Sequence, residues 1–343
     1  MFSRNNLYLA YLSGIVFVCL CILIGVSVGS IAIPLSTSAE ILWRTLWNLK
    51  MPASINETDV SIIINIRFPR VILAVLVGAA LAIAGVAFQG LLKNPLADPY
   101  TLGVSSGSAL GAVIVLYTGL SLPFLGNFTL PVISIITGFL TLLCILGFVR
   151  AIEKTLRTET IILAGIIVSS FLGSFISLII ALTGDELRQI ISWLMGSVSM
   201  RGWEYSGLMF PFFLGGVVLL LLNSKELNAL VFGEETAKTL GVDADKRRIV
   251  ILAGASLLTG SAVAVSGTIG FVGLVIPHLV RLLYGPDHRL LLPLSLFAGA
   301  GFLVLTDLAA RTIIAPTELP IGVITAILGA PVFGLLLYQQ RKG

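Results

Sequence analysis

The residue types that usually do chemistry in proteins are scarce in this chain, and none is spaced for catalysis. His278 and His288 are the only histidines and lie ten residues apart. Cys19, Cys21 and Cys144 lie in apolar runs and form no CxxC pair, which indicates small buried hydrophobic residues. The sequence has no phosphate-binding G-x-x-x-x-G-K-[ST] loop, nucleophile elbow, zinc signature or nucleic-acid-binding module. We therefore expect no catalytic residue, metal site, cofactor or nucleic-acid partner.

Three arginines carry recognisable binding chemistry. Arg67 and Arg70 stand in the run Arg-Phe-Pro-Arg before an apolar stretch, and Arg311 follows another such stretch, four residues after Asp307. Guanidinium groups pair with carboxylates in a bidentate geometry, so these arginines could accept acidic side chains of a protein partner. Two alternatives stay open, because arginines near a helix end often only extend to the membrane surface and Arg311 could pair only with Asp307.

Residues 89–102, QGLLKNPLADPYTL, form a second informative segment. Pro95 and Pro99 forbid a continuous helix, and Asn94 and Asp98 can hydrogen-bond the freed backbone. Non-helical backbone near membrane depth is tolerated only where it is buried or lines water. The segment predicts the lining of a transport path that includes Asn94 and Leu96, with an ordinary tight turn as the alternative.

Residues 223–248, NSKELNALVFGEETAKTLGVDADKRR, predict two short helices joined at a glycine. Leu227 and Leu230 recur at helical spacing before Gly233, and Glu234 then opens a second helix, where an acidic residue favours the N-terminal dipole. Glu234 and Lys238 have the favourable i, i+4 order, and a glycine at 241 suits the helix end. We expect a docking surface for another protein, with a solvated loop lying on the membrane as the alternative. Its residues are Leu227, Leu230, Gly233, Glu234, Lys238 and Gly241.

The composition indicates what positions these segments. Of the 343 residues, 57% are hydrophobic and only 11% charged, whereas soluble domains carry about 25% charged residues. A soluble core of this size could not hide so much apolar surface. The 35 glycines suit helices that pack closely in lipid. The chain is therefore expected to be an all-α membrane protein with a single domain over residues 1–343.

Ten apolar stretches approach the roughly 20 residues that a helix needs to cross a bilayer. The stretches at 102–118, 249–265 and 269–283 are short or interrupted by glycine. The first stretch is too long for a typical signal peptide and is interpreted as a span. The ten ranges are 8–29, 70–88, 102–118, 130–149, 161–182, 205–222, 249–265, 269–283, 290–309 and 321–338.

Basic residues predict the orientation of these spans, because cytoplasmic segments carry an excess of Lys and Arg. With both termini cytoplasmic, the outer segments hold Arg44, Lys50, Arg67, Arg70, Arg188, Arg201 and Arg311, and the other 14 of the 21 basic residues are inside. Loop 223–248 then lies in the cytoplasm between the sixth and seventh spans. The four tryptophans fall in outer segments, as interfacial anchors should; they are Trp43, Trp47, Trp193 and Trp203.

Two stretches of the sequence are similar to each other. Residues 76–85 read LVGAALAIAG and residues 258–267 read LTGSAVAVSG. The first lies on a span predicted to run inward and the second on one predicted to run outward. Repeats of opposite orientation are a common plan in transporters, and chance likeness between two Gly/Ala-rich helices is the alternative.

Taken together, these segments resemble the permeases of bacterial ATP-binding-cassette (ABC) importers for iron-siderophore complexes, haem and cobalamin, the FecCD-type or type II importers. The likeness extends over nearly all of the chain beyond residue 60 and leaves residues 1–60 as the variable part. The stretches that carry it are RFPR (67–70), GVAFQGLLKNPLADPYTLGVSSGSALGA (85–112), WLMGS (193–197), LNALVFGEETAKTLGV (227–242), GTIGFVGLVIPHLVRLLYGPDHRLLLP (267–293), TDLAAR (306–311) and LPIGVITAILGAPVFGLLL (319–337).

The resemblance implies partners and roles. It implies ten helices per subunit, a homodimer or heterodimer of permeases, two cytoplasmic ATPases, an extracytoplasmic binding protein and a location in the bacterial cell membrane. The chain itself would be non-catalytic. Loop 227–242 would form coupling helices on the ATPases, and Arg67, Arg70 and Arg311 would meet acidic residues of the binding protein. Asn94, Leu96 and Thr158 would line the cytoplasmic gate, although Arg157 and Glu159 make the loop around Thr158 more charged than the family pattern.

The expected function is import of an iron-siderophore complex, or of haem or cobalamin, by alternating access driven by partner ATPases. The alternative is a secondary transporter coupled to ions, which would require carboxylates inside the membrane. Asp307, near the end of a predicted span, is the candidate for such a carboxylate. A membrane scaffold is a third class, but it would not explain the broken segment 89–102.

Overall fold

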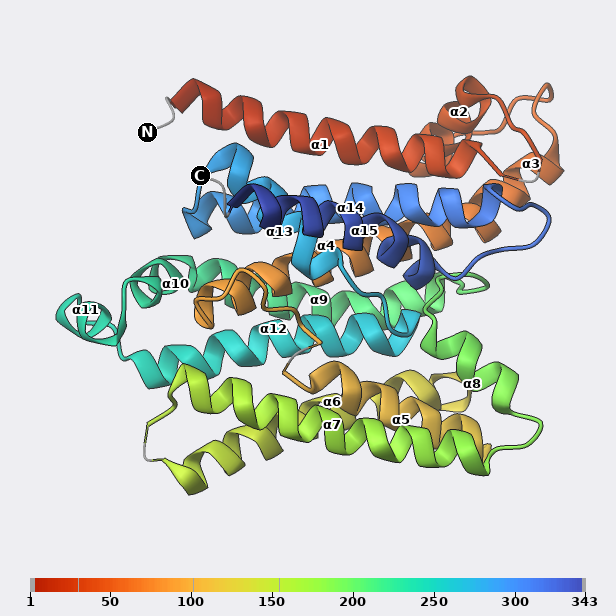
Figure 1. The fold of residues 1–343 in the computed structure, drawn as a ribbon. Coiled ribbons are helices and arrows are strands. Elements are labelled where there is room, and N and C mark those ends of the chain that lie inside the picture. Colours follow the sequence, from red (N-terminus) through yellow and green to blue (C-terminus); the bar gives the residue numbers. More distant parts are fainter. Residues whose placement is uncertain (1–3, 30, 101, 154, 341–343) are drawn as a thin grey trace.

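The computed structural model describes residues 4–340 except 30, 101 and 154, and every element in that part of the chain is helical. Long helices lie side by side along one direction, and short helices sit at the two ends of the bundle (Figure 1). The helices are α1 (Arg4–Ser27), α2 (Leu35–Leu46), α3 (Glu57–Ser61), the π-helical η1 (Ile62–Arg67), α4 (Phe68–Leu91), α5 (Val104–Thr118), η2 (Gly126–Phe128), α6 (Thr129–Ile152), α7 (Thr158–Leu182), α8 (Leu187–Leu194), α9 (Trp203–Leu222), α10 (Ser224–Val231), α11 (Glu234–Thr239), α12 (Ala244–Ser266), α13 (Val272–Tyr284), α14 (His288–Thr312) and α15 (Ile321–Gln340).

Each of the ten ranges predicted from hydropathy contains a helix, although α1 ends at Ser27, α5 begins only at Val104 and α13 only at Val272. Within the described residues, seven helical segments are long and apolar enough to cross a membrane, and α5, α13 and α15 are shorter apolar helices. Ten complete crossings therefore remain a prediction. The expectation of an interrupted seventh span was wrong, because α12 runs unbroken for 23 residues. Its glycine at 254 allows close packing against Leu219 and Leu220 of α9 without breaking the helix.

The core is built around α4. In its most apolar window, 89% of the residues are buried, and α4 contacts α9, α12, α13 and α14. Residues 76–85 are rich in Gly and Ala. Small residues let helix backbones approach closely in lipid, which explains why α4 can lie at the centre of the bundle. A Cβ on Gly85 would lie 2.0 Å from the carbonyl oxygen of Gly273, and one on Gly78 would lie 2.3 Å from that of Gly299.

The packing supports the inverted-repeat interpretation. Helix α4 is followed by an irregular connection and the short α5, and α12 is followed by an irregular connection and the short α13. Helix α4 packs on α14 and α13, and α12 packs on α6 and α5, so each contact in one half has an equivalent in the other. The two helices run in opposite directions (Figure 1), and they carry the two similar sequences.

The two ends of the bundle differ. Helices α2, α3 and α8 and the α14–α15 connection lie at one end, here called the α2–α3 end (Figure 1). Helices α10 and α11 lie at the other end, the α10–α11 end, together with the start of α1 and the end of α15. This arrangement suits the predicted orientation with both termini on the side of loop 223–248. Three basic residues in the charge count lie outside the described residues: Lys154, Arg341 and Lys342.

Burial corrects two expectations. Trp43 and Trp47 are each 60% exposed, and Trp203 is exposed and donates to the carbonyl oxygen of Ile64, which fits interfacial anchors. The assignment of Trp193 was wrong, because it is buried beside the helices α5 and α12. The three cysteines were predicted to be buried, but only Cys21 is buried within the chain. The cysteines at 19 and 144 are exposed on α1 and α6.

Candidate functional site

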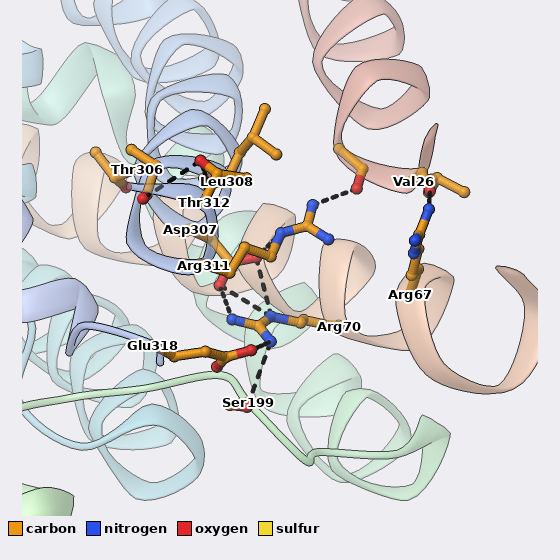
Figure 2. Close-up of polar contacts among 12 residues, drawn as sticks. Val26, Arg67, Arg70, Ser199, Thr306, Asp307, Leu308, Arg311, Thr312 and Glu318 are labelled. Atoms are coloured by element: carbon orange, nitrogen blue, oxygen red, sulfur yellow. Dashed lines mark hydrogen bonds and ion pairs between the residues drawn. The ribbon is translucent and has the colours of Figure 1, made fainter. Parts of the chain in front are cut away.

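The structure brings the three predicted arginines together at the α2–α3 end, as Figure 2 shows. Arg67 ends η1, Arg70 lies in the first turn of α4, and Arg311 lies in the last turn of α14. The helical chain is continuous from residue 57 to residue 91. Proline at 69 lies just after the π-helical η1 within this continuous run, and π-helical turns and prolines both interrupt the regular α-helical hydrogen bonds.

Arg70 is the centre of this cluster (Figure 2). Its Nε and Nη2 donate to the carboxylate of Asp307 at 2.8–3.1 Å. Its Nη1 donates to Oε1 of Glu318 at 2.8 Å and to Oγ of Ser199 at 3.3 Å. The Asp307 side chain is 1% exposed and the Arg70 side chain 11%, so this is a largely buried ion pair, which is costly to break once formed.

Arg67 and Arg311 bind the C-terminal end of α1. The last carbonyl groups of a helix have no partner within it and carry partial negative charge, so guanidinium groups are suitable donors there. The acceptors are the carbonyl oxygens of Val26 at 3.0 Å, Ser27 at 2.8 Å and Ile31 for Arg67, and of Gly25 for Arg311. Arg311 also lies 3.7 Å from Asp307, so the pair considered in the sequence exists. Each arginine therefore has an internal structural role.

The charge balance of the cluster is still positive. Three guanidinium groups lie with the carboxylates of Asp307 and Glu318, and all three arginines line a cavity of about 160 Å³ together with Glu318. Burial, the largest single influence, raises the pKa of Glu318, but the hydrogen bonds from Arg70 and Ser199 and the charges of Arg70 and Arg311 together outweigh burial and lower that pKa. Glu318 is thus ionised at neutral pH, although its side chain is 39% exposed.

At the opposite end, α4 stops at Leu91, and residues 92–100 and 102–103 form turns and irregular backbone. As predicted, the side chains of this segment hold its backbone: Asn94 Oδ1 accepts from the amide of Leu96 at 2.9 Å, and Asp98 Oδ1 accepts from the amide of Tyr100 at 3.1 Å. The Tyr100 hydroxyl accepts from the amide of Ile269, in the equivalent connection of the other half. The two irregular connections are therefore tied together, and the Leu96 side chain is left 42% exposed.

Thr158 lies at the start of α7 and lines a cavity of about 580 Å³ at the α10–α11 end. The cavity also reaches the end of α4 and the start of α11, so it joins the irregular segment to the predicted docking helices. Of the charged residues that line it with Thr158, Arg157, Glu159 and Glu234 were already named from the sequence, whereas Lys93 and Arg248 were not.

The two docking helices form where they were predicted. Helix α10 ends at Val231, Gly233 takes a φ of 118° that favours glycine, and α11 begins at Glu234. The exposure of the leucines was not as expected, however. Leu227 and Leu230 are 0% and 2% exposed, because they pack α10 onto the bundle.

A different set of apolar residues is exposed on these helices. Phe232 is 75% exposed, Leu240 is 64% exposed and Val231 is 39% exposed. We call these three residues the α10–α11 apolar patch. Helical spacing predicted an amphipathic segment correctly, but it could not show which apolar residues the bundle covers.

The partner of Glu234 also differs from the prediction. Its carboxylate pairs with Arg248 of α12 at 2.7 Å, whereas the spacing predicted Lys238. The hydrogen bond from Arg248 lowers the pKa of Glu234. The Arg248 side chain is 3% exposed and also donates to the carbonyl oxygen of Leu156, before α7. Arg248 thus connects α11 to two membrane-length helices.

Helix α10 has a second attachment that the sequence did not reveal. The side-chain amide of Asn228 donates to Asp287 at 2.7 Å, and its Oδ1 accepts from the amide of His288 at 2.9 Å and from Nδ1 of His288 at 2.8 Å. These bonds fix α10 to the start of α14. Within the described residues, no group of three His, Cys, Asp or Glu could hold a metal ion.

A glycine-packed bundle of membrane-length apolar helices is the architecture of a multi-pass membrane protein. Residues 16–339 match the FecCD transport family, and the chain belongs to that family. It is 58% identical over 99% of its length to the uncharacterized ABC transporter permease protein YvrB of Bacillus subtilis, and it covers 96% of that protein.

More distant relatives have named substrates. The chain is 42% identical to the cobalamin import system permease protein BtuC of Halobacterium salinarum, over 83% of this chain and 75% of that protein. It is 40% identical to the hemin transport system permease protein HmuU of Yersinia pestis, over 88% and 89%. A solved structure described as an inward-facing conformation of a metal-chelate type ABC transporter matches with a TM-score of 0.82 at 35% identity, covering 96% of this chain and 98% of that one. The chain is therefore an ABC importer permease of the bacterial cell membrane, as the resemblance implied.

Proposed function

We propose that this chain lines the translocation path of an ABC importer and works as one of two permease subunits. In this proposal all ten apolar helices cross the membrane, both termini are cytoplasmic, and ATP is hydrolysed by separate subunits on the α10–α11 end. A binding protein delivers substrate to the α2–α3 end. The observation that carries the proposal is the α10–α11 apolar patch, which is exposed on helices whose side chains bond to α12 and to the residue before α14.

The bonds around α10 and α11 provide a mechanical route for coupling. A force applied to the patch would reach α12 through Glu234 and Arg248 and α14 through Asn228 and Asp287. Helix α12 packs on α4, and α14 packs on α4 from another side. Movement of the docked ATPases would therefore act on the core helix of the permease, and the segment 92–103 at its end would open or close.

We propose that the substrate is an iron-siderophore complex, with haem or cobalamin as the alternatives. The named substrates of the two relatives are both large metal chelates, and the structural neighbour is of metal-chelate type. A secondary transporter is less well supported, because the buried Asp307 is engaged by Arg70 and Arg311. The binding protein that co-purifies with the permease, and the ligand that mass spectrometry finds in it, test the assignment.

The first prediction concerns docking of the ATPases. Replacing Phe232 and Leu240 together by Asp should reduce ATPase co-purification at least tenfold, because two charges would enter an apolar contact. The thermal stability of the permease should be unchanged, since both side chains are exposed. As a matched control, Leu230→Asp should destabilise the permease itself, because Leu230 is buried. Normal co-purification of the double variant would refute docking at this patch.

The second prediction concerns the gate. A cysteine at Leu96, in a chain whose three native cysteines are replaced by serine or alanine, should cross-link between the two permeases to an extent that depends on bound nucleotide. Leu96 is exposed on the segment expected to move. A cysteine at Leu122, which is exposed before α6 and far along the chain from this segment, serves as the control. Equal cross-linking at position 96 in all nucleotide states would count against a gate there.

A further inference from the structure

The guanidinium of Arg70 has two edges that can bind a carboxylate in a bidentate manner. The edge formed by Nε and Nη2 is occupied by Asp307, which is almost fully buried. The other edge requires Nη1, and Nη1 already donates to Glu318 and Ser199. An acidic side chain that arrives from outside must therefore compete with Glu318 for Arg70.

Glu318 is suited to be displaced, whereas Asp307 is not. Glu318 lies on the connection between α14 and α15, its side chain is 39% exposed, and a single oxygen contacts Arg70. Asp307 lies within α14, is 1% exposed and uses both oxygens. Exposed ion pairs are weak because water screens them, whereas buried pairs are costly to break. The Arg70–Glu318 ion pair is thus weaker than the Arg70–Asp307 ion pair.

We propose that Glu318 is an internal competitor for the carboxylate of the docking partner, and that docking exchanges one for the other on Arg70. This rests on the proposed function, in which a binding protein docks at the arginine cluster. Without the partner, Glu318 occupies Nη1 of Arg70 and holds the α14–α15 connection beside it. With the partner bound, its carboxylate replaces Glu318 and the connection is released.

Release of the α14–α15 connection would affect the start of α15 and the segment between α8 and α9. The α14–α15 connection is held by the bond from Leu319 N to Ala310 O at 2.9 Å and by the bond from Ile321 N to Gly196 O at 3.0 Å. The second bond joins the start of α15 to the segment between α8 and α9, which also carries Ser199 on Arg70. Loss of Glu318 from Arg70 would loosen the contact between these segments. The exchange therefore links docking outside to the position of α15.

One test needs no partner. In Glu318→Ala, Arg70 should react with phenylglyoxal about two- to fivefold faster, as measured by mass spectrometry, which corresponds to the weak energy of an exposed ion pair. Arg188, exposed on α8 at the same end, gives the reference rate in each sample. Glu57→Ala removes another exposed charge at this end, at the start of α3, and is the matched control, for which the Arg70 rate should not change. Unchanged reactivity of Arg70 in Glu318→Ala would overturn the proposal.

The second test uses the binding protein that co-purifies with the wild-type permease. Glu318→Ala and Glu318→Gln should both bind it about two- to fivefold more tightly, with a steeper salt dependence because the cluster gains net positive charge. Arg70→Ala should weaken binding and remove the effect of Glu318→Ala. Weaker binding by Glu318→Ala would show that Glu318 contributes to docking and would refute competition. If Arg70 reactivity rises while no cluster variant alters binding, the internal pair stands and the docking site is wrong.

Discussion

Replacing Asp307 by Ala should lower the free energy of unfolding of the permease by about 3–5 kcal/mol, as expected when one partner of a buried ion pair is removed. Asp307 is 1% exposed and neutralises Arg70 at 2.8 Å and Arg311 at 3.7 Å. Without the Asp307 carboxylate, the guanidinium groups of Arg70 and Arg311 would remain largely buried, with only the partly exposed carboxylate of Glu318 nearby. Thermal unfolding in detergent, followed by tryptophan fluorescence, measures the loss.

An exposed ion pair of the same length provides the control. Glu40 and Arg44 also approach to 2.8 Å, but their side chains are 43% and 31% exposed. Glu40→Ala should therefore cost only about 0.2–1 kcal/mol. Asp307→Asn, which keeps the shape and loses the charge, should fall between the two. If Asp307→Ala proves no more harmful than Glu40→Ala, the arginine cluster is not a buried structural unit.

The second large effect is expected at Gly85. A methyl group at this position would lie 2.0 Å from the carbonyl oxygen of Gly273, so Gly85→Ala must push α4 away from α13. Overpacking of a core costs about 1–3 kcal/mol, and a backbone atom cannot move aside as a side chain can. We expect a loss of at least tenfold in transport together with a lower unfolding temperature. Uptake of the substrate in cells and thermal unfolding of the purified protein measure the two effects.

Gly260 is the matched control because it lies on the equivalent helix α12 with room to spare. The nearest heavy atom to a methyl group there is Ser108 Oγ at 3.6 Å, an ordinary contact. Gly260→Ala should leave transport intact and stabilise the helix slightly, since Ala is favoured over Gly in helices by about 1 kcal/mol. Equal behaviour of the two variants would refute close packing as the reason for glycine at 85.

The arginine cluster shows how docking and stability can share residues. Arg67 and Arg311 hold the end of α1 through backbone carbonyl groups, so variants of either residue will change the fold as well as any docking. Arg70 differs, because its Nη1 faces an exposed carboxylate. Experiments on docking are therefore clearest at Glu318, which can be changed without removing a buried charge.

The sequence by itself determined the class of protein and the order of its helices. Hydropathy and glycine content are sums over local residues, and a helix in lipid must satisfy its own backbone, so span positions can be inferred without knowing any neighbour. The turn at Gly233 and the side-chain bonds of Asn94 and Asp98 were likewise predictable, because each depends on residues close in the chain. The resemblance to the FecCD family rested on motifs in their expected order.

Only the tertiary structure decided the partners of the functional side chains. Arg67 bonds to carbonyl groups of α1, and a backbone acceptor leaves no signature in the sequence. Glu234 pairs with Arg248 rather than Lys238, since spacing reveals neighbours on one helix but not those on another. Leu230 is buried while Phe232 is exposed, because periodicity defines an apolar face without showing what covers it. Burial, and therefore the strength of each charged contact, is a property of the packed bundle as a whole.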